Sequence, residues 1–223
     1  MTRCGCTWLS ESSGQDYNRQ VEYEPFRKLV RERRTVRAYR VEEVDLRLIE
    51  QAIEDACWAP SPHHTQPWRF VLIAAEAERR RLAEAMGEKW QADLSQDELS
   101  PRLIDGQLKG SRVRLSKAQT LLVVCLSQRD LDRYPDERRQ TAERDMAVQS
   151  IGAAIQNLLL ALHLNGLGTC WMCAPLFCPD IVRDTLDLAQ DWEPQALITI
   201  GRAVQAPPTP RRRPVGDLLL TLA

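Results

Sequence analysis

"GAAIQNLLLALHLNG", at residues 152–166, places apolar residues on both sides of a helix. Ile155, Leu158 and Leu162 recur at the helical spacing, and the small residues 152–154 lie beside them. A helix that is apolar nearly all round is buried, so it is either the central helix of a domain or packs against a second subunit. The pattern predicts a helix over 141–165, with Gly166 as a natural C-terminal cap.

The rest of the chain alternates helical and strand-like patterns on both sides of this helix. Helices are expected at 24–33, 44–60, 76–92, 97–115 and 178–188. Strands are expected at 68–75, 120–127, 168–173 and 195–204. This succession predicts an α+β fold in which helices cover a sheet, and no linker divides it into two domains.

Length and composition are those of one globular domain. Of the 223 residues, 43% are hydrophobic and 27% are charged, and the formal net charge is -1. A charge so close to zero gives no field that would draw the chain to nucleic acid or to a membrane surface. The polar residues 1–23 are expected to form a flexible segment, and residues 24–223 a single domain with a C-terminal arm.

The two ends of the chain carry further expectations. No long apolar segment opens the sequence, which predicts a cytoplasmic protein whose seven cysteines are thiols. The last residues, "DLLLTLA", are apolar and follow a stretch rich in proline and arginine. Because apolar ends avoid water, this arm is expected to pack on its own core or on a partner chain.

Two arginine clusters are candidates for binding one anion from two sides. "RERRTVRAYR", at 31–40, places Arg33, Arg34 and Arg37 around Thr35, and residues 211–213 form the second cluster. Forked guanidinium donors and a hydroxyl group suit a phosphate monoester. Either run alone is more often a solvated surface, because short basic runs are weak motifs.

"APSPHHTQPWRF", at 59–70, places two of the three histidines side by side in a loop with three prolines. Prolines restrict φ, so the loop is expected to be rigid and to hold a ligand. His63 has two interpretations, a packing partner of Trp68 or a functional group. A metal site is not expected, because adjacent histidines in a loop point apart and no acidic residue completes a ligand set.

Four motifs in this order resemble the nitroreductase family of FMN-dependent oxidoreductases over about residues 24–223. They are "RRTVRAYR", "APSPHHTQPWRF", "GAAIQNLLLALHLNGLGTCW", and "ALITIGRA" with the later "RRRP". The resemblance implies a mixed sheet of four or five strands wrapped by helices. It also implies an interlocked homodimer with FMN at the subunit interface, in which the C-terminal arm of one chain adds to the other.

The same resemblance implies roles for individual residues. Those that would hold the FMN phosphate and ribityl chain are Arg33, Arg34, Thr35, Arg37, Arg211 and Arg213. Those that would approach the flavin ring of the neighbouring subunit are Pro60, Ser61, Pro62 and His64, and those at the flavin edge are Cys173 and Ala174. His64 stands where the family has asparagine, which makes it the candidate residue on the substrate side. No catalytic acid is apparent.

Several segments are similar to the C-terminal flavin domain of the actinobacterial coenzyme F-420 gamma-glutamyl ligase, among them "APSPHHT", "YPDERRQTAERDM" and "GLGTCW". That similarity implies reduction of the dehydro precursor of the deazaflavin coenzyme F-420. Two alternatives stay open: a general NAD(P)H-dependent nitroreductase or quinone reductase, and a protein that binds flavin or deazaflavin without turnover. The expected partners are a second copy of the chain and a deazaflavin, nitro or quinone substrate.

The cysteines at 170–178 admit two interpretations. "CWMC", with Cys178 beyond it, is either a thiol redox pair or iron–sulfur site, or a set of packing residues. Alternation along a strand sends Cys170 and Cys173 to opposite faces, which favours packing. His163, on the apolar helix, is expected to be a core or interface histidine. Cys4 and Cys6 have no expected role.

Overall fold

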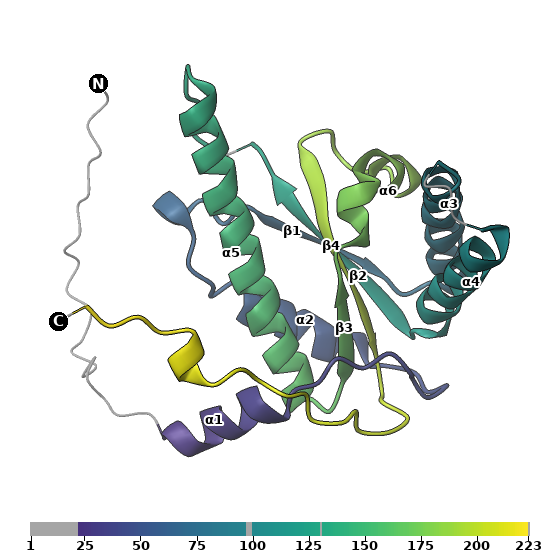
Figure 1. Ribbon diagram of the computed structural model, residues 1–223, viewed down its shortest axis with the longest axis horizontal. Coiled ribbons are helices and arrows are strands. Elements are labelled where there is room, and N and C mark those ends of the chain that lie inside the picture. Colours follow the sequence, from purple (N-terminus) through teal and green to yellow (C-terminus); the bar gives the residue numbers. More distant parts are fainter. Residues whose placement is uncertain (1–21, 97–99, 130, 223) are drawn as a thin grey trace.

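Four strands form one sheet at the centre of the molecule (Figure 1). The computed structural model describes residues 22–96, 100–129 and 131–222. In spatial order the strands are β1 (Trp68–Ile73), β2 (Thr120–Ser127), β4 (Trp192–Gly201) and β3 (Gly168–Met172). Neighbouring strands pair antiparallel, and one parallel bridge joins Thr35 to Thr169 on β3. The predicted α+β fold is confirmed.

Helices lie on both faces of this sheet (Figure 1). The α-helices are α1 (Tyr23–Glu32), α2 (Leu46–Ala56), α3 (Glu76–Leu94), α4 (Pro101–Lys117), α5 (Glu137–Leu164) and α6 (Pro179–Thr185). Short 3-10 turns are η1 (Pro62–His64), η2 (Ala174–Phe177) and η3 (Val215–Asp217). Each long element expected from the sequence is present, although β4 begins at Trp192, before the expected 195.

The central strand β2 explains why both faces are covered. All of its residues are buried, and successive side chains point to opposite faces. Leu122 and Val124 join the core beneath α2 and α5, whereas Leu121 and Val123 join the core beneath α3 and α6. A strand that is apolar on both sides needs a helical layer on each face, so its sequence requires a three-layer domain.

The long helix α5 begins and ends at defined caps. Asp136 caps its first turn by accepting a hydrogen bond from the Arg139 N–H at 3.0 Å, so the helix starts one turn before the expected Thr141. At the other end Gly166 has φ of 73°, and its N–H donates to His163 O at 3.0 Å. Leu167 N–H donates to the helix at 2.9 Å, which completes a Schellman motif.

In the single chain α5 is not buried all round, so the alternative of a central helix enclosed by its own domain is wrong, and packing against a second subunit stays a prediction. Ile155 and Leu158 are buried against the sheet, but Gln156 and Leu164 are exposed and Gly152 is half-buried. The sheet and α2 cover only one side of the helix, which leaves the other side open. By length and composition α5 also suffices to cross a membrane, but half of its apolar window is buried within the molecule, as in a core helix.

The segment that follows α1 pairs with β3 through Thr35 and Val36, and with the chain just after β4 through Tyr39 and Arg40, which fixes the position of the first arginine cluster. Val36 N–H donates to Thr169 O at 2.8 Å. A Cβ atom on Gly168 would lie 2.8 Å from Val36 Cγ2, closer than side chains approach, so the segment can lie this near to β3 only because residue 168 is glycine. The arginines between 33 and 37 are therefore held at the edge of the sheet.

The C-terminal arm leaves β4 and runs past the end of α5 (Figure 1). Its apolar side chains are between 64% and 86% exposed: Val215, Leu218, Leu219, Leu220 and Leu222. The alternative that the arm packs on its own core is therefore wrong. At the other end, the predicted flexible segment up to residue 21, with Cys4 and Cys6, lies outside the described residues, and Tyr23 already belongs to α1.

Candidate functional site

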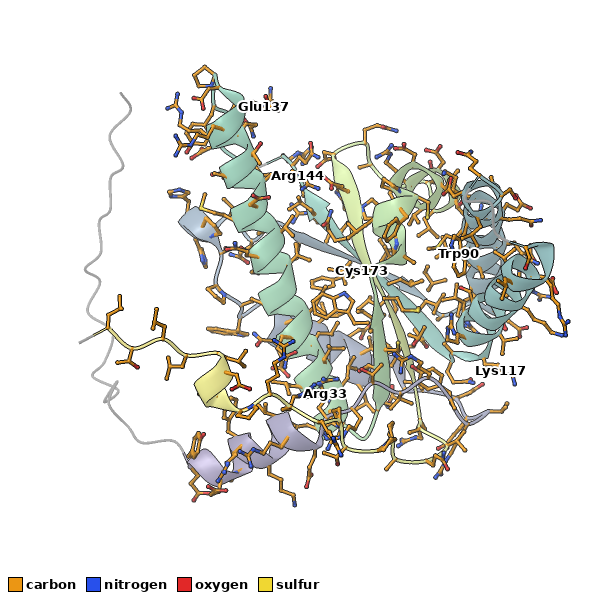
Figure 2. All side chains as sticks on the ribbon, viewed as in Figure 1. Arg33, Trp90, Lys117, Glu137, Arg144 and Cys173 are labelled. Atoms are coloured by element: carbon orange, nitrogen blue, oxygen red, sulfur yellow. The ribbon has the colours of Figure 1, made fainter. Side chains whose placement is uncertain are left out.

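Arg33 lies just beyond α1, at the foot of α5 (Figure 2). Its guanidinium is half-buried and makes no hydrogen bond or ion pair within the part of the chain that the structure describes. Burial lowers its pKa, and the positive charges of Arg212 and Arg34 lower it further. Three guanidinium groups that repel one another at one place favour the binding of an anion.

The C-terminal arm is joined to this place by Arg34. Arg34 Nη2 donates to Thr209 Oγ1 at 2.9 Å, and its Nη1 donates to the carbonyl oxygen of Arg33 at 2.9 Å. The Arg34 side chain therefore already has hydrogen-bond partners within the chain, and it stabilises the position of the segment. The structure thus brings the two arginine clusters together, as the sequence predicts. It adds Arg212 to the predicted Arg211 and Arg213, because the charge of Arg212 acts on Arg33.

Arg37 belongs to a second positive group, on the side of the segment that faces Cys170. Burial raises the pKa of the Cys170 thiol, while the charges of Arg37 and Arg114 oppose that shift. Both guanidinium groups therefore lie near this thiol. Arg37 stands four positions after Arg33, with three residues between them, so the two positions are at most about 13 Å apart in extended chain. Arg33 lies near Arg34 and Arg212, and Arg37 lies with Arg114 near Cys170, so the segment presents two positive centres with Thr35 between them in the chain.

A cavity of about 540 Å³ opens between α3, α4 and the end of β3. Its apolar walls include Met86, Trp90, Met172 and Phe177. Cys173 and Ala174, both predicted to face the flavin edge, also line it, together with Arg114 of α4. Lys89 at its wall is paired with Asp93, whereas Arg114 has no acidic partner among the described residues. An apolar cavity with one unpaired cation suits a flat ring that carries partial negative charge.

The cysteines next to this cavity are free thiols, of which Cys170 and Cys178 are buried and Cys173 is exposed. Because β3 ends at Met172, Cys173 lies beyond the strand, and its predicted placement on the opposite strand face stays a prediction. Cys178 is buried and its Sγ lies 3.6 Å from Ala174 O. Burial raises the pKa of the Cys178 thiol, as it does for Cys170. Within the described ranges no three potential metal ligands come together.

A smaller cavity of about 300 Å³ lies beside the first arginine cluster. Arg33, Arg34, Arg40 and His163 line it. His163 is half-buried in the last turn of α5, and burial lowers its pKa, with the nearby charge of Glu32 acting in the opposite direction. The imidazole is therefore neutral at neutral pH. The predicted core or interface histidine is thus a neighbour of the arginine cluster.

The predicted flavin-facing loop lies on the opposite side of α5 from Cys173 (Figures 1 and 2). It carries Pro60, Ser61, Pro62 and His64 between α2 and β1. Gln66 N–H donates to Ser61 Oγ at 3.0 Å, so Ser61 braces the loop from within. The single chain therefore does not bring this loop to the other predicted residues.

The sequence model of the nitroreductase family matches residues 30–202. A Bacillus subtilis (strain 168) protein provisionally named as the NAD(P)H nitroreductase YfhC is 25% identical over 199 residues, 88% of this chain and 93% of that protein. The structure of a BluB-like flavoprotein from Clostridium difficile 630 has a TM-score of 0.76 and 21% identity over 89% of this chain and 99% of that one. A nitroreductase-type protein from Desulfovibrio desulfuricans, solved with FMN, has a TM-score of 0.69 and 24% identity over 89% and 97%.

The fold and the two positive centres define a protein that binds a phosphorylated ring cofactor. The chain belongs to the nitroreductase family, and the family expected from the four sequence motifs is confirmed. As a member of that family it is an FMN-dependent oxidoreductase. Sequence reasoning missed Arg114 because α4 reads as an exposed charged helix, although Leu108 and Leu115 mark the side that packs inward. It also missed Gln66, because its contact with Ser61 Oγ is visible only in three dimensions.

Proposed function

We propose that this chain binds FMN and uses it to reduce the dehydro precursor of the deazaflavin coenzyme F-420. The observation that carries the cofactor assignment is Arg33, a half-buried guanidinium with no partner among the described residues, placed beside Arg34 and Arg212. A half-buried positive charge without a partner favours the binding of an anion, and a phosphate monoester suits a guanidinium group. The acceptor is proposed from the motifs that this chain shares with the F-420 ligase flavin domain.

The two positive centres correspond to the two ends of FMN. The Arg33 group, with the arm residues 211–213, would hold the phosphate, and Arg37 with Arg114 would lie at the ring. FMN supplies the hydride chemistry when bound, and the protein adjusts charge and access. Arg37 and Arg114 would place two positive charges near the ring, which would favour its uptake of electrons. Cys173 and Ala174 would form the wall beside them.

A homodimer is part of the proposal. The open side of α5, the exposed apolar arm and the loop around His64 are three surfaces that one chain leaves without a partner among the described residues. In a dimer the loop of one chain would border the flavin site of the other. Burial of the arm and of the open helix side would supply the apolar contact area that a stable dimer needs.

A general nitro- or quinone reductase is the second candidate function. The provisional NAD(P)H nitroreductase name of the Bacillus subtilis relative favours it, and also favours a nicotinamide as electron donor. The two candidates differ in what His64 would meet. An anionic precursor gains a hydrogen bond from an imidazole N–H, and a neutral quinone gains less.

The test is a mass measurement on the product. FMN-loaded protein is incubated with the dehydro precursor and a reductant, and addition of two hydrogens is expected to raise the mass by about two daltons. A nitroaromatic and a neutral quinone are assayed in parallel. Turnover of these two without any change in the precursor would replace the first candidate by the second. A preparation that takes up no FMN would remove both.

A further inference from the structure

The loop between α2 and β1 has an unusual backbone. His63, His64 and Gln66 have φ of 49°, 58° and 46°, in the left-handed region that residues other than glycine rarely adopt. Such a backbone persists only where surrounding contacts hold it. Here His64 N–H donates to Ser61 O at 3.2 Å and Gln66 N–H donates to Ser61 Oγ at 3.0 Å. The loop therefore has one defined shape.

Within this shape the side chains of His64 and Gln66 meet. Gln66 Nε2 and His64 Nε2 lie 3.1 Å apart. With the amide in this orientation its nitrogen donates, so the imidazole Nε2 is the acceptor and the ring proton belongs on Nδ1. Nδ1 of His64 has no partner within the described residues, which leaves a N–H donor available to a ligand.

The neighbouring histidine differs in this respect. His63 is exposed like His64 and shares the left-handed backbone, yet its ring makes no hydrogen bond within the described part of the chain. Gln66 therefore fixes one histidine of the pair and not the other. A hydrogen-bond donor that is already oriented needs no reorganisation when it binds an anionic ligand, so the contact with Gln66 favours His64 over His63 as the ligand-binding histidine.

We propose that Gln66 is a positioning residue, which holds the His64 ring in the orientation and tautomer whose Nδ1–H donates to an anionic oxygen of the substrate. This inference rests on the proposed function, in which the loop borders the flavin site of the neighbouring subunit. The substrate class is an acceptor that carries a carboxylate, an enolate or a phosphodiester oxygen. A neutral quinone would not use the donor.

The first test reads the tautomer of His64 by ¹⁵N NMR in the flavin-loaded protein at neutral pH. With three histidines in the chain, the imidazole signals can be assigned by single substitutions. The parent is expected to show the Nδ1–H form. Gln66→Glu replaces a donor by an acceptor and should move the proton to Nε2, and Gln66→Leu should give a mixture. His63→Asn is the matched control and should leave the His64 signal as in the parent.

The second test is kinetic and uses the dehydro precursor and menadione, a neutral quinone. Gln66→Leu should raise KM for the precursor about fivefold, the loss of roughly one hydrogen bond, with kcat and bound FMN close to the parent values. Menadione kinetics should not change, and His63→Asn should change neither substrate.

Two results would overturn the inference. One is a His64 tautomer that is the same in the parent, Gln66→Glu and Gln66→Leu. The other is an equal loss for both substrates together with released FMN, which would make Gln66 a purely structural loop residue. A parent protein that binds FMN but leaves the precursor unreduced would contradict the proposed function, and the tautomer measurement would still decide the role of Gln66.

Discussion

Arg34 donates from Nη2 to Oγ1 of Thr209 at 2.9 Å, although the two residues are 175 positions apart in the chain. This contact ties the segment that follows α1 to the C-terminal arm. It explains how Arg212 comes close enough to lower the pKa of Arg33. The phosphate site of the proposed function is therefore built from both ends of the domain, and its integrity depends on this tie.

Thr209→Val should weaken FMN binding about fivefold, which corresponds to about 1 kcal/mol, because it removes the acceptor and loosens residues 211–213. The change is small because the contact is exposed. Equilibrium dialysis with FMN measures it, and Thr209→Ser, which keeps the hydroxyl, should bind like the parent. Equal binding by all three proteins would show that the tie does not support the site.

Arg33→Ala should weaken FMN binding by on the order of 2 kcal/mol or more, since it removes charge-assisted bonds to a phosphate. Binding of riboflavin, which lacks the phosphate, distinguishes a residue that contacts the phosphate from one that contacts the ring. Arg33→Ala should leave riboflavin binding unchanged. Arg37→Ala and Arg114→Ala should weaken both ligands, because these residues are assigned to the ring end.

A different pattern of binding by the Arg37 variant would reassign Arg37 from the ring end of FMN to the phosphate end. If Arg37→Ala reduced FMN binding and left riboflavin binding unchanged, Arg37 would belong to the phosphate site, as the sequence resemblance implies. The assignment of Arg37 to the ring would then be wrong. Arg40, which is exposed and lines the smaller cavity, provides a control cation, and Arg40→Ala should affect neither ligand.

Gly168→Ala should destabilise the protein by about 1–3 kcal/mol and also lower FMN affinity, because the added Cβ would lie 2.8 Å from Val36 Cγ2. The clash would push the arginine segment away from β3. Denaturant unfolding and FMN titration measure the two effects. Val36→Ala in the same protein should restore FMN affinity only in part, since it removes both methyl groups but keeps the Val36 Cβ, which lies 2.9 Å from the added Cβ. Gly106→Ala, where nothing lies within 4 Å, is the control and should not destabilise.

The free energy of unfolding should fall as the pH rises above about 9. Burial raises the pKa of Cys125, on β2, from 9.0 to about 12, and it also raises the pKa of Tyr39. Above about pH 9 for Cys125 and above about pH 10 for Tyr39, the unfolded chain loses the proton and the folded chain keeps it. The folded state binds more protons, so stability decreases with pH, by up to about 1.4 kcal/mol per pH unit for each group.

Cys125→Ala isolates one of these groups. Its slope of unfolding free energy against pH, measured by urea titrations between about pH 9 and 11, should be shallower than that of the parent. The comparison uses slopes, since loss of the sulfur atom also lowers stability at every pH. Parallel lines for the two proteins would show that the Cys125 thiol ionises alike in both states.

Local patterns predicted most of the fold from the sequence. Apolar periodicity identified α5 and β2, and Gly166 marked a helix end that proved to be a Schellman motif. Boundaries were less accurate where a cap decides them, as at Asp136. Burial of α5 was overestimated because an apolar helix face looks the same in sequence whether its own sheet or a partner chain covers it.

The site was predictable in its residue types and less so in its geometry. Motif order identified the arginine clusters and the histidine loop, and the structure joined the clusters through Arg34 and Thr209. The unpaired charge of Arg114 could not be foreseen, since it depends on which carboxylates lie nearby in space. The contact between His64 and Gln66 likewise depends on left-handed φ values, which cannot be predicted from either residue type.

Deletion of residues 215–223 should convert the proposed homodimer toward monomer and reduce retention of FMN. The deleted arm carries Leu218, Leu219 and Leu220, which are exposed in the single chain and need a partner to leave water. Light scattering should show the dimer dissociation constant rising at least about tenfold, a loss of about 1.4 kcal/mol. FMN should be lost in step, because the arm continues from the arginines at 211–213.

A single substitution in the arm tests the same idea without truncation. Leu219→Asp places a charge where burial against a partner is proposed, and should weaken the dimer as the deletion does. Val41→Asp is the matched control, because Val41 is fully exposed and lies outside the arm. If Leu219→Asp dissociates the dimer and Val41→Asp does not, the arm is the contact that holds the two chains together. A parent protein that is a stable, FMN-loaded monomer would exclude the dimer, and with it the assignment of the His64 loop to a neighbouring site.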